Sequence, residues 1–218
     1  MIRKLISVIA TSMILSACTS VSHQPLDAKL SQNLQGKSLI STQYEKPDFS
    51  AMTAGKAAFA AIGAAAMISE GNSIVRENNI SDPAISIADS LLDKLKSSRN
   101  MEIQKGSAVA KSDEIGALLS DYSGSEYLLD VKTFNWMFGY YPDDWSHYRV
   151  IYNARMRLID VTTKKVIAET MCNSTQGDDK NPPTKDDLLN NGAQLLKEYL
   201  EKASTACVDV LATQVLML

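Results

Sequence analysis

Residues 125–161 read SEYLLDVKTFNWMFGYYPDDWSHYRVIYNARMRLIDV. Aromatic and β-branched residues, which favour strands, run through both halves of this stretch. The sequence YPDD at 141–144 separates the halves and is typical of a turn. We therefore predict two long antiparallel strands over 126–140 and 146–161. A third strand over 165–172 completes a meander.

Hydrophobic alternation sets the expected register of the first two strands. Pairing Tyr140 with Trp145 places Leu129 opposite Met156 and continues as one apolar face. The same pairing leaves Asp130 on the other face, as expected for a face in contact with solvent. A shift by one residue would mix the two faces.

The aromatic residues near the turn extend the solvated face in this register. Exposed Trp and Phe side chains beside Arg have the composition of a protein-interaction hot spot. The candidate partner-binding residues are Phe134, Trp136, Phe138, Tyr140, Trp145 and Arg149. Two other interpretations stay open. The N-terminal segment or the Ala-rich segment folds over these residues and makes them a second core, or they contact a membrane interface.

Working outward, we predict that strands and helices alternate on both sides of the meander. The expected elements are strands over 37–44 and 101–109, helices over 52–69, 84–98 and 113–119, and irregular chain over 72–81. Asp82 and Pro83 provide an N-cap and a first helical residue. Thr184 starts a long last helix with a continuous apolar stripe. The Ala-rich stretch 52–69 is expected to pack inside the protomer or against another copy, with membrane insertion as the minority alternative.

These elements predict an α+β fold. A single mixed or antiparallel sheet contains the three-stranded meander, helices pack on the sheet, and a long helix ends the chain. With 218 residues, 45% apolar and 22% charged, the chain is long enough to bury a substantial core. The formal charge of −3 argues against nucleic acid as a partner.

Three segments resemble a known family of envelope domains: Ile85–Leu95, Ser125–Lys132 and Ala154–Val166. They are similar to motifs of the periplasmic α+β domain shared by the curli-secretion lipoprotein CsgG, the N-terminal domain of TolB and lipoprotein activators of peptidoglycan synthases. The resemblance covers roughly 37–211 and implies a role in envelope assembly. Such a role includes secretion and the control of cell-wall synthesis.

The N-terminus resembles a bacterial lipoprotein signal. A basic start and a short apolar stretch lead to Leu15-Ser16-Ala17-Cys18, which is similar to a lipobox. The resemblance implies cleavage before Cys18 and acylation of that residue, and Thr19 after it favours the outer membrane. The alternative is an unlipidated secretory peptide.

We predict three parts: a signal peptide over 1–17, a lipidated tether over 18–33 and a periplasmic α+β domain over 34–218. Cleavage removes two basic residues, so 20 basic and 25 acidic side chains remain and the charge becomes about −5. Because the periplasm is oxidising, Cys172 and Cys207 are expected to form a disulfide, with two buried free thiols as the alternative.

The sequence offers no catalytic constellation, metal site or cofactor motif, so we expect a protein that is not an enzyme. The expected function is a binding or assembly factor in envelope biogenesis or secretion, anchored to the outer membrane through acyl chains on Cys18 and facing the periplasm. Its partner is an envelope protein. The alternative is a self-assembling ring or a channel-associated subunit, in which the Ala-rich helix and the aromatic residues form the contact between copies.

Overall fold

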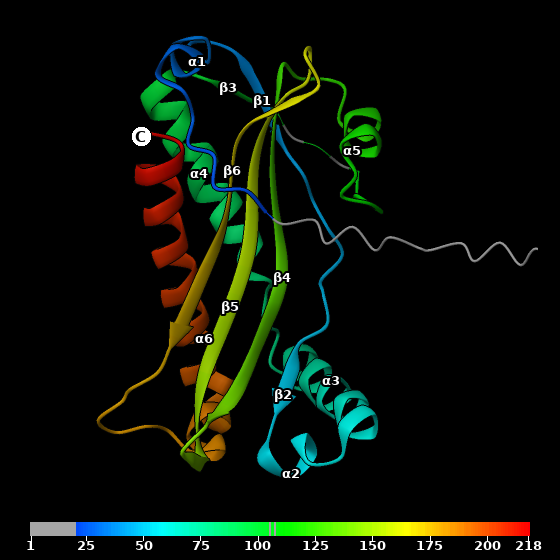
Figure 1. The fold of residues 1–218 in the computed structure, drawn as a ribbon, viewed down its shortest axis with the longest axis vertical. Coiled ribbons are helices and arrows are strands. Elements are labelled where there is room, and N and C mark those ends of the chain that lie inside the picture. The colour runs from blue at the N-terminus through cyan, green and yellow to red at the C-terminus, as the bar shows by residue number, and fades with distance from the viewer. Residues whose placement is uncertain (1–20, 105, 107) are drawn as a thin grey trace, which may run out of the picture.

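The computed structural model describes residues 21–218 apart from 105 and 107. The signal peptide and Cys18 lie outside the described residues. The centre is one mixed sheet in the order β3-β1-β4-β5-β6, with β2 paired to the same edge of β4 as β1 (Figure 1). The strands are β1 (Ser38–Ser41), β2 (Ser50–Met52), β3 (Glu102–Gln104), β4 (Tyr127–Tyr141), β5 (Asp144–Asp160) and β6 (Lys165–Gln176).

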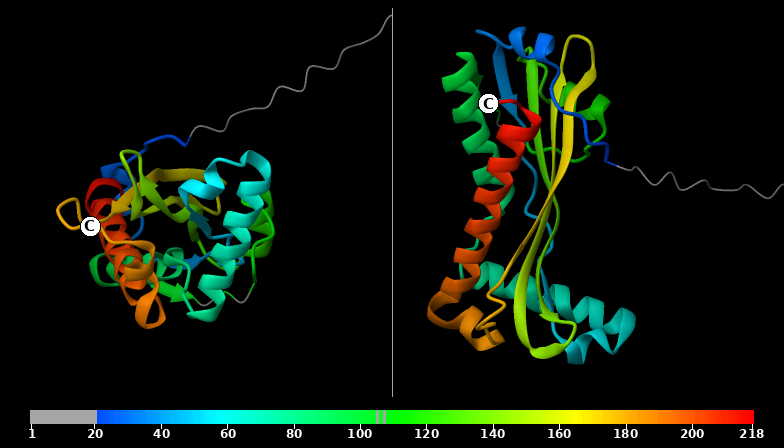
Figure 2. Two further views of the ribbon diagram at one scale, coloured as in Figure 1. Left: turned by 90° about the horizontal axis from the view of Figure 1, so that it is seen from below. Right: turned by 60° about the vertical axis from the view of Figure 1, so that its left-hand side comes forward.

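Helices surround this sheet, and the predicted α+β class is confirmed. They are α1 (Ala28–Gln32), α2 (Ala54–Ala57), α3 (Ala60–Glu77), α4 (Pro83–Arg99), α5 (Ile115–Asp121) and α6 (Lys185–Val210), followed by a π-helical turn over Leu211–Val215. The helices α4 and α6 lie together along one face of the sheet, here called the inner face, and bury the main core (Figures 1 and 2). The short helix α5 covers only one end of the opposite, outer face.

The two helices of the inner face begin where their capping residues predict. The Asp82 carboxylate accepts a hydrogen bond from the Ala84 N–H at 3.0 Å, and Pro83 occupies the first turn of α4. Thr184 and Asp187 form a reciprocal capping box at the start of α6. The apolar stripe of α6 is interrupted at Asn190–Ala193, where the backbone leaves helical geometry.

A disulfide between Cys172 and Cys207 joins β6 to α6, with the two Cα atoms 5.6 Å apart. Both residues are buried, and the alternative of free thiols does not hold in this structure. The bond links the last helix to the last strand, and so closes a loop that includes the whole polar connection between them.

The Ala-rich segment does not form the single helix expected over 52–69. Met52 ends β2, the short α2 follows, and α3 continues to Glu77 through chain expected to be irregular. Helix α3 lies directly on β2, because a Cβ added at Gly71 would collide with the Phe49 carbonyl oxygen. This close approach lets Ile74 join the core, and the buried contact extends the helix beyond its Ala-rich half.

The predicted register of the β4–β5 hairpin is wrong by two residues in its first half. Asp130 lies opposite Arg157, and Leu129 lies opposite Leu158. A shift by two leaves each residue on its expected face, so the apolar face of this half is confirmed. The error arises at the tip. There a two-residue turn joins the strands, and β5 has extra residues around Trp145 that have no partner on β4.

The described part of the segment 18–33, expected to be a tether, is docked on the domain. The Gln24 N–H donates to the Glu169 carbonyl at 2.8 Å, and the Glu169 N–H donates back at 2.9 Å. Leu26 is buried in the main core, and α1 follows it. The chain is therefore docked on the domain from about Ser22 onward, because one buried leucine and a backbone pairing suffice to hold a segment that is otherwise polar.

Across the described part of the chain, no helix combines the length and the apolar character needed to span a bilayer.

Replacing both Cys172 and Cys207 with serine tests the contribution of the disulfide. The two residues are 35 positions apart, and closing a loop of that length stabilises a fold by about 4 kcal/mol in the chain-entropy model. We expect the double variant to lose about that much unfolding free energy in a denaturant titration. A loss no larger than that of a single exposed Ser substitution would mean that the bond does not constrain the unfolded chain.

Candidate interaction surface

A β-bulge at Phe134 governs which side chains of β4 point outward. Thr133 pairs with Ala154, but Asn135 pairs with Asn153, so Phe134 is an extra residue on β4. One extra residue reverses the alternation of all positions beyond it. Before the bulge the odd-numbered residues face the inner core, and after it the even-numbered residues do.

This reversal overturns part of the predicted patch. Trp136 and Phe138 were expected on the solvated face, and both are buried in the main core. Phe49 packs edge-on against Trp136 with ring centroids 5.0 Å apart, and the Trp136 Nε1–H donates to the Pro47 carbonyl at 3.2 Å. The segment that carries β2 thus covers these aromatics. They belong to the main core, and not to a second core made by the N-terminal or the Ala-rich segment.

The other members of the predicted patch are divided between surface and core. Phe134 is 49% exposed and Trp145 is 67% exposed. Tyr140 packs against the main core, and the Arg149 guanidinium lies over the Tyr141 ring at 5.4 Å. The structure therefore divides the six residues. Tyr140 and Trp145 still pack edge-on, with ring centroids 6.5 Å apart, but the two exposed aromatics, Phe134 and Trp145, lie at different places on the hairpin.

Two cationic side chains flank Phe134 on the outer face. The Lys132 ammonium is 5.5 Å and the Arg155 guanidinium is 5.1 Å from the centre of the Phe134 ring. Asp113, from the loop before α5, pairs with Arg155 at 2.8 Å and with Lys132 at 3.3 Å. We call these four residues, with Tyr44, the Phe134 surface.

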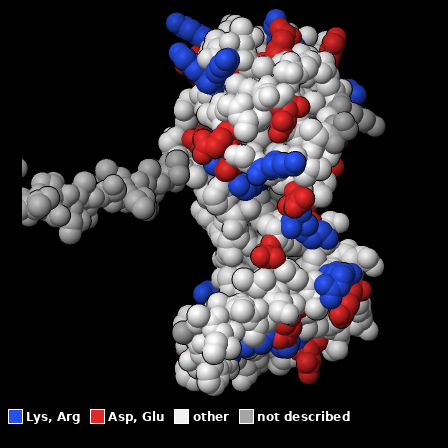
Figure 3. Space-filling model, turned by 90° about the vertical axis from the view of Figure 1, so that its right-hand side faces the viewer, with Lys and Arg blue, Asp and Glu red and all other residues white. Residues whose placement is uncertain are grey.

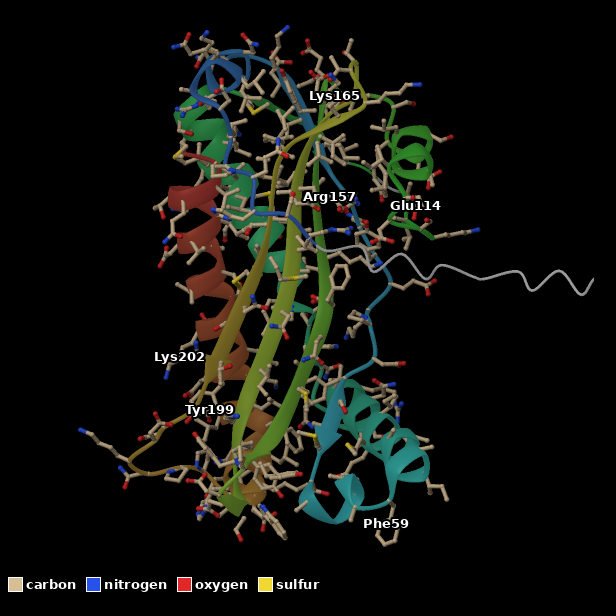
Figure 4. The ribbon with its side chains drawn as sticks, viewed as in Figure 1. Phe59, Glu114, Arg157, Lys165, Tyr199 and Lys202 are labelled. Atoms are coloured by element: carbon tan, nitrogen blue, oxygen red, sulfur yellow. A yellow bond between two sulfur atoms is a disulfide. The ribbon has the colours of Figure 1, made fainter. Side chains whose placement is uncertain are left out.

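A buried ionic network lies beneath this surface. The Asp130 carboxylate is fully buried and accepts hydrogen bonds from the Thr42 hydroxyl at 3.1 Å and the Tyr44 hydroxyl at 2.5 Å. It also accepts from Arg157 Nε at 2.8 Å and from Arg155 at 3.3 Å. Figure 4 shows Arg157 on the upper part of the sheet, at about the level of Glu114. Four donors satisfy a charge that would otherwise be costly to bury.

The network sets the charge of the Phe134 surface. Lys132, Arg155 and Arg157 carry three positive charges against two on Asp113 and Asp130, which leaves one positive charge in excess. Although partial burial opposes it, the ion pairs with Arg155 and Lys132 hold the pKa of Asp113 below its ordinary value. Burial and the Asp130 carboxylate raise the pKa of Tyr44, so its phenol stays protonated and donates.

A cavity of about 360 Å³ lies beside the surface and is lined by Tyr44, Lys111, Lys132 and Asp82, among others. The Asp82 carboxylate accepts a 2.5 Å hydrogen bond from the Thr133 hydroxyl. Burial raises the pKa of Asp82, although this hydrogen bond, the Ala84 N–H and the charge of Lys46 oppose the shift. Within the described chain, no three His, Cys, Asp or Glu side chains gather closely enough to hold a metal ion.

Sequence reasoning placed Asp130 and Lys132 on a solvated face but gave them no role. The signal was present in the motifs DVK and RMR, which put charges on the same side of two paired strands. Tyr44 and Asp113 come from distant segments, and only the fold brings them to this place.

No protein-family model matches this sequence, and no curated protein matches it. Similar solved structures include a variant of the PelC dodecamer from Paraburkholderia phytofirmans, with a TM-score of 0.39 and 15% identity over 88% of this chain and 93% of that chain. Protein XCC0632 from Xanthomonas campestris has a TM-score of 0.42 and 13% identity over 87% and 89%. Lipoprotein GNA1162 from Neisseria meningitidis has a TM-score of 0.31 and 13% identity over 81% and 99%.

At these identities and TM-scores the similarities support no statement about function. The resemblance to the CsgG and TolB domains stays a prediction from the sequence motifs.

Replacing Asp130 with alanine removes the acceptor that four donors share. Two buried arginines then lose their common partner, and breaking a buried ion pair in this way costs about 3 to 5 kcal/mol. We expect chemical denaturation to show a loss of that size. The matched control is Asp93→Ala, at an exposed position of α4, which should change stability little. Equal losses in the two variants would contradict the central role of Asp130.

Replacing Asp82 with asparagine tests the raised pKa of its carboxyl. A raised folded-state pKa favours the folded protein at low pH, and this stability is lost as the pH rises through the folded value. Asparagine keeps the cap and the acceptor for Thr133 without the charge. The variant should therefore gain unfolding free energy relative to the wild type as the pH rises from about 4 to neutral. A difference that does not change with pH would contradict the shift.

Proposed function

We propose that this protein is a lipid-anchored binding or assembly factor of the bacterial envelope, and that it docks a protein partner on the Phe134 surface. One observation carries the proposal. A bulge turns a large aromatic ring out of the sheet between two cations, on a part of the outer face that α5 does not reach. Aromatic side chains are enriched in protein interfaces, and Phe134 and Lys132 are accessible here, whereas Arg155 is buried and supports the ring from below.

The chemistry of the surface supports binding rather than catalysis. The carboxylate of the surface, Asp113, is engaged by two cations, and the Asp130 carboxylate beneath it by four donors. A general acid or base needs a titrating group that can reach a substrate, and Asp130 is fully buried. The positive excess beside Phe134 suits a partner segment that combines an apolar side chain with Asp or Glu.

Anchoring through acyl chains on Cys18 supports this function by confining the domain. A protein held at the membrane surface meets partners there at a high effective concentration. A modest surface of one aromatic ring and its neighbours then suffices for a specific complex.

The alternative is self-assembly into a ring or a channel-associated subunit. The exposed Ala-rich half of α3, which carries Ile62 at 81% exposure, favours this interpretation. The two functions predict different crosslinked products, so one experiment separates them.

A photocrosslinking amino acid in place of Phe134, in the full-length lipoprotein, tests the proposal in intact envelopes. We expect an adduct with a different envelope protein, identified by mass spectrometry. Adding Lys132→Glu should lower the adduct yield several-fold, because it reverses a charge beside the ring. The control Lys94→Glu, at an exposed position of α4, should leave the yield unchanged. An adduct with a second copy would favour the ring, and no intermolecular adduct would contradict both functions.

A further inference from the structure

The helix α2 and the first half of α3 form an apolar projection at one end of the molecule, here called the lobe (residues 54–69). Lys56 is its one charged residue, and the next charge along the chain is Glu70. Phe59 is 70% exposed and Ile62 is 81% exposed. Figure 4 shows Phe59 pointing away from the sheet, and the lobe is the broad white area at the lower left of Figure 3.

The exposed positions of the lobe extend around the helix rather than along one side. Besides Phe59 and Ile62, the exposed apolar positions are Ala58, Ala61, Ala64, Ala65, Ala66 and Ile68, and Gly55 and Ser69 are exposed as well. The charges at its base are tied together, because Lys56 and Lys185 both pair with Glu70. A helix that is apolar on all sides is normally buried in a protein core or in a membrane, and not left in water.

The N-terminal arm limits how far the domain can move from its anchor. The Ser22 hydroxyl donates to the Glu169 carboxylate at 3.1 Å, and His23 Nδ1 hydrogen-bonds with the Thr170 hydroxyl at 3.1 Å. From Ser22 back to Cys18 there are four residues, which span at most about 14 Å. An acylated Cys18 would therefore hold Ser22 within that distance of the lipid surface.

The arm and the lobe lie on the same side of the molecule. In Figure 1 the first described residues, in dark blue, lie in front of the sheet, and α3 projects to the right. In both views of Figure 2 the start of the arm and the end of α3 that follows α2 are turned toward the same flank. A membrane that touches the arm can therefore also touch the lobe.

We propose that the lobe inserts Phe59 and Ile62 into the lipid surface to which Cys18 is attached. The inference rests on the acylation included in the proposed function, but not on the protein partner. Because the acyl anchor already confines the lobe at the membrane, even a weakly apolar helix is inserted for much of the time. The lobe then acts as a second contact that fixes the orientation of the domain, with the Phe134 surface at a defined angle to the bilayer.

The length of the arm favours lipid over a second copy as the occupant of the lobe. If Cys18 is acylated, four residues of chain at most separate the lipid from Ser22 and keep the bilayer close to this flank, whereas nothing in the described chain brings a neighbouring copy there. The alanines also suit a shallow position at the headgroup level, because only Phe59, Ile62 and the neighbouring Ile68 need to reach the acyl chains.

The test uses the full-length acylated protein in vesicles of phosphatidylethanolamine and phosphatidylglycerol, at a low ratio of protein to lipid. Ile62→Cys carries an environment-sensitive fluorophore, and this thiol is the free one because Cys18 is acylated and Cys172 is disulfide-bonded to Cys207. The matched control is Ile85→Cys, since Ile85 is also exposed, at 58%, but lies on α4.

Phospholipids with spin-labelled acyl chains should quench the Ile62 probe several-fold more than the Ile85 probe. Iodide in the buffer should quench the Ile85 probe more than the Ile62 probe. A probe at Phe59→Cys should be quenched in the same pattern as the probe at Ile62. Agreement between the two would show that the result does not come from the Ile62 substitution itself.

Equal quenching at Ile62 and Ile85 by the spin-labelled lipid overturns the proposal. An Ile62 probe that neither lipid nor iodide quenches also overturns it, because such a probe is covered by protein. Vesicle flotation is measured on the same samples. Protein that does not float shows that acylation itself has failed, and so identifies a failure of the proposed function rather than of the lobe.

Discussion

The bulge at Phe134 is the constraint on which the rest of this structure depends. Strand β4 is fifteen residues long, and it contributes to the same inner core along its whole length. Without the extra residue the strict alternation of a strand would place Trp136 and Phe138 in solvent. With the extra residue, both rings pack against Phe49 from the segment beside β2. The half of the hairpin near its turn is therefore packed by aromatic side chains.

The same bulge also shapes the outer face. It turns Phe134 outward, where the side chain meets Lys132 and Arg155. These cations do not move freely, because Asp113 holds both of them and the buried Asp130 network holds Arg155 from below. A surface whose side chains are already held in place loses less conformational entropy when a partner binds.

The N-terminal arm shows how a small number of contacts fixes the position of a polar segment. A pair of backbone hydrogen bonds at Gln24 and the burial of Leu26 dock on the domain a segment that the sequence presents as flexible. The consequence is geometric. A segment on a long flexible connection samples many orientations, whereas one that is docked on the domain has a fixed position relative to it.

Local signals in the sequence determined the elements whose ends depend on neighbouring residues. Asp82 with Pro83 and Thr184 with Asp187 fixed the starts of two helices, and alternation identified the meander and its apolar face. The lipobox-like sequence at Cys18 is of the same kind and lies outside the described residues.

Only the tertiary structure decided the features that depend on distant segments. The bulge exists because Phe49 and Pro47 cover Trp136, and nothing near Phe134 in the sequence announces it. Helix α3 is longer than expected because Gly71 lets it rest on the backbone of Phe49. Sequence patterns record the preferences of one segment at a time. Which residue faces solvent in a long hairpin depends on what packs against it from elsewhere in the chain.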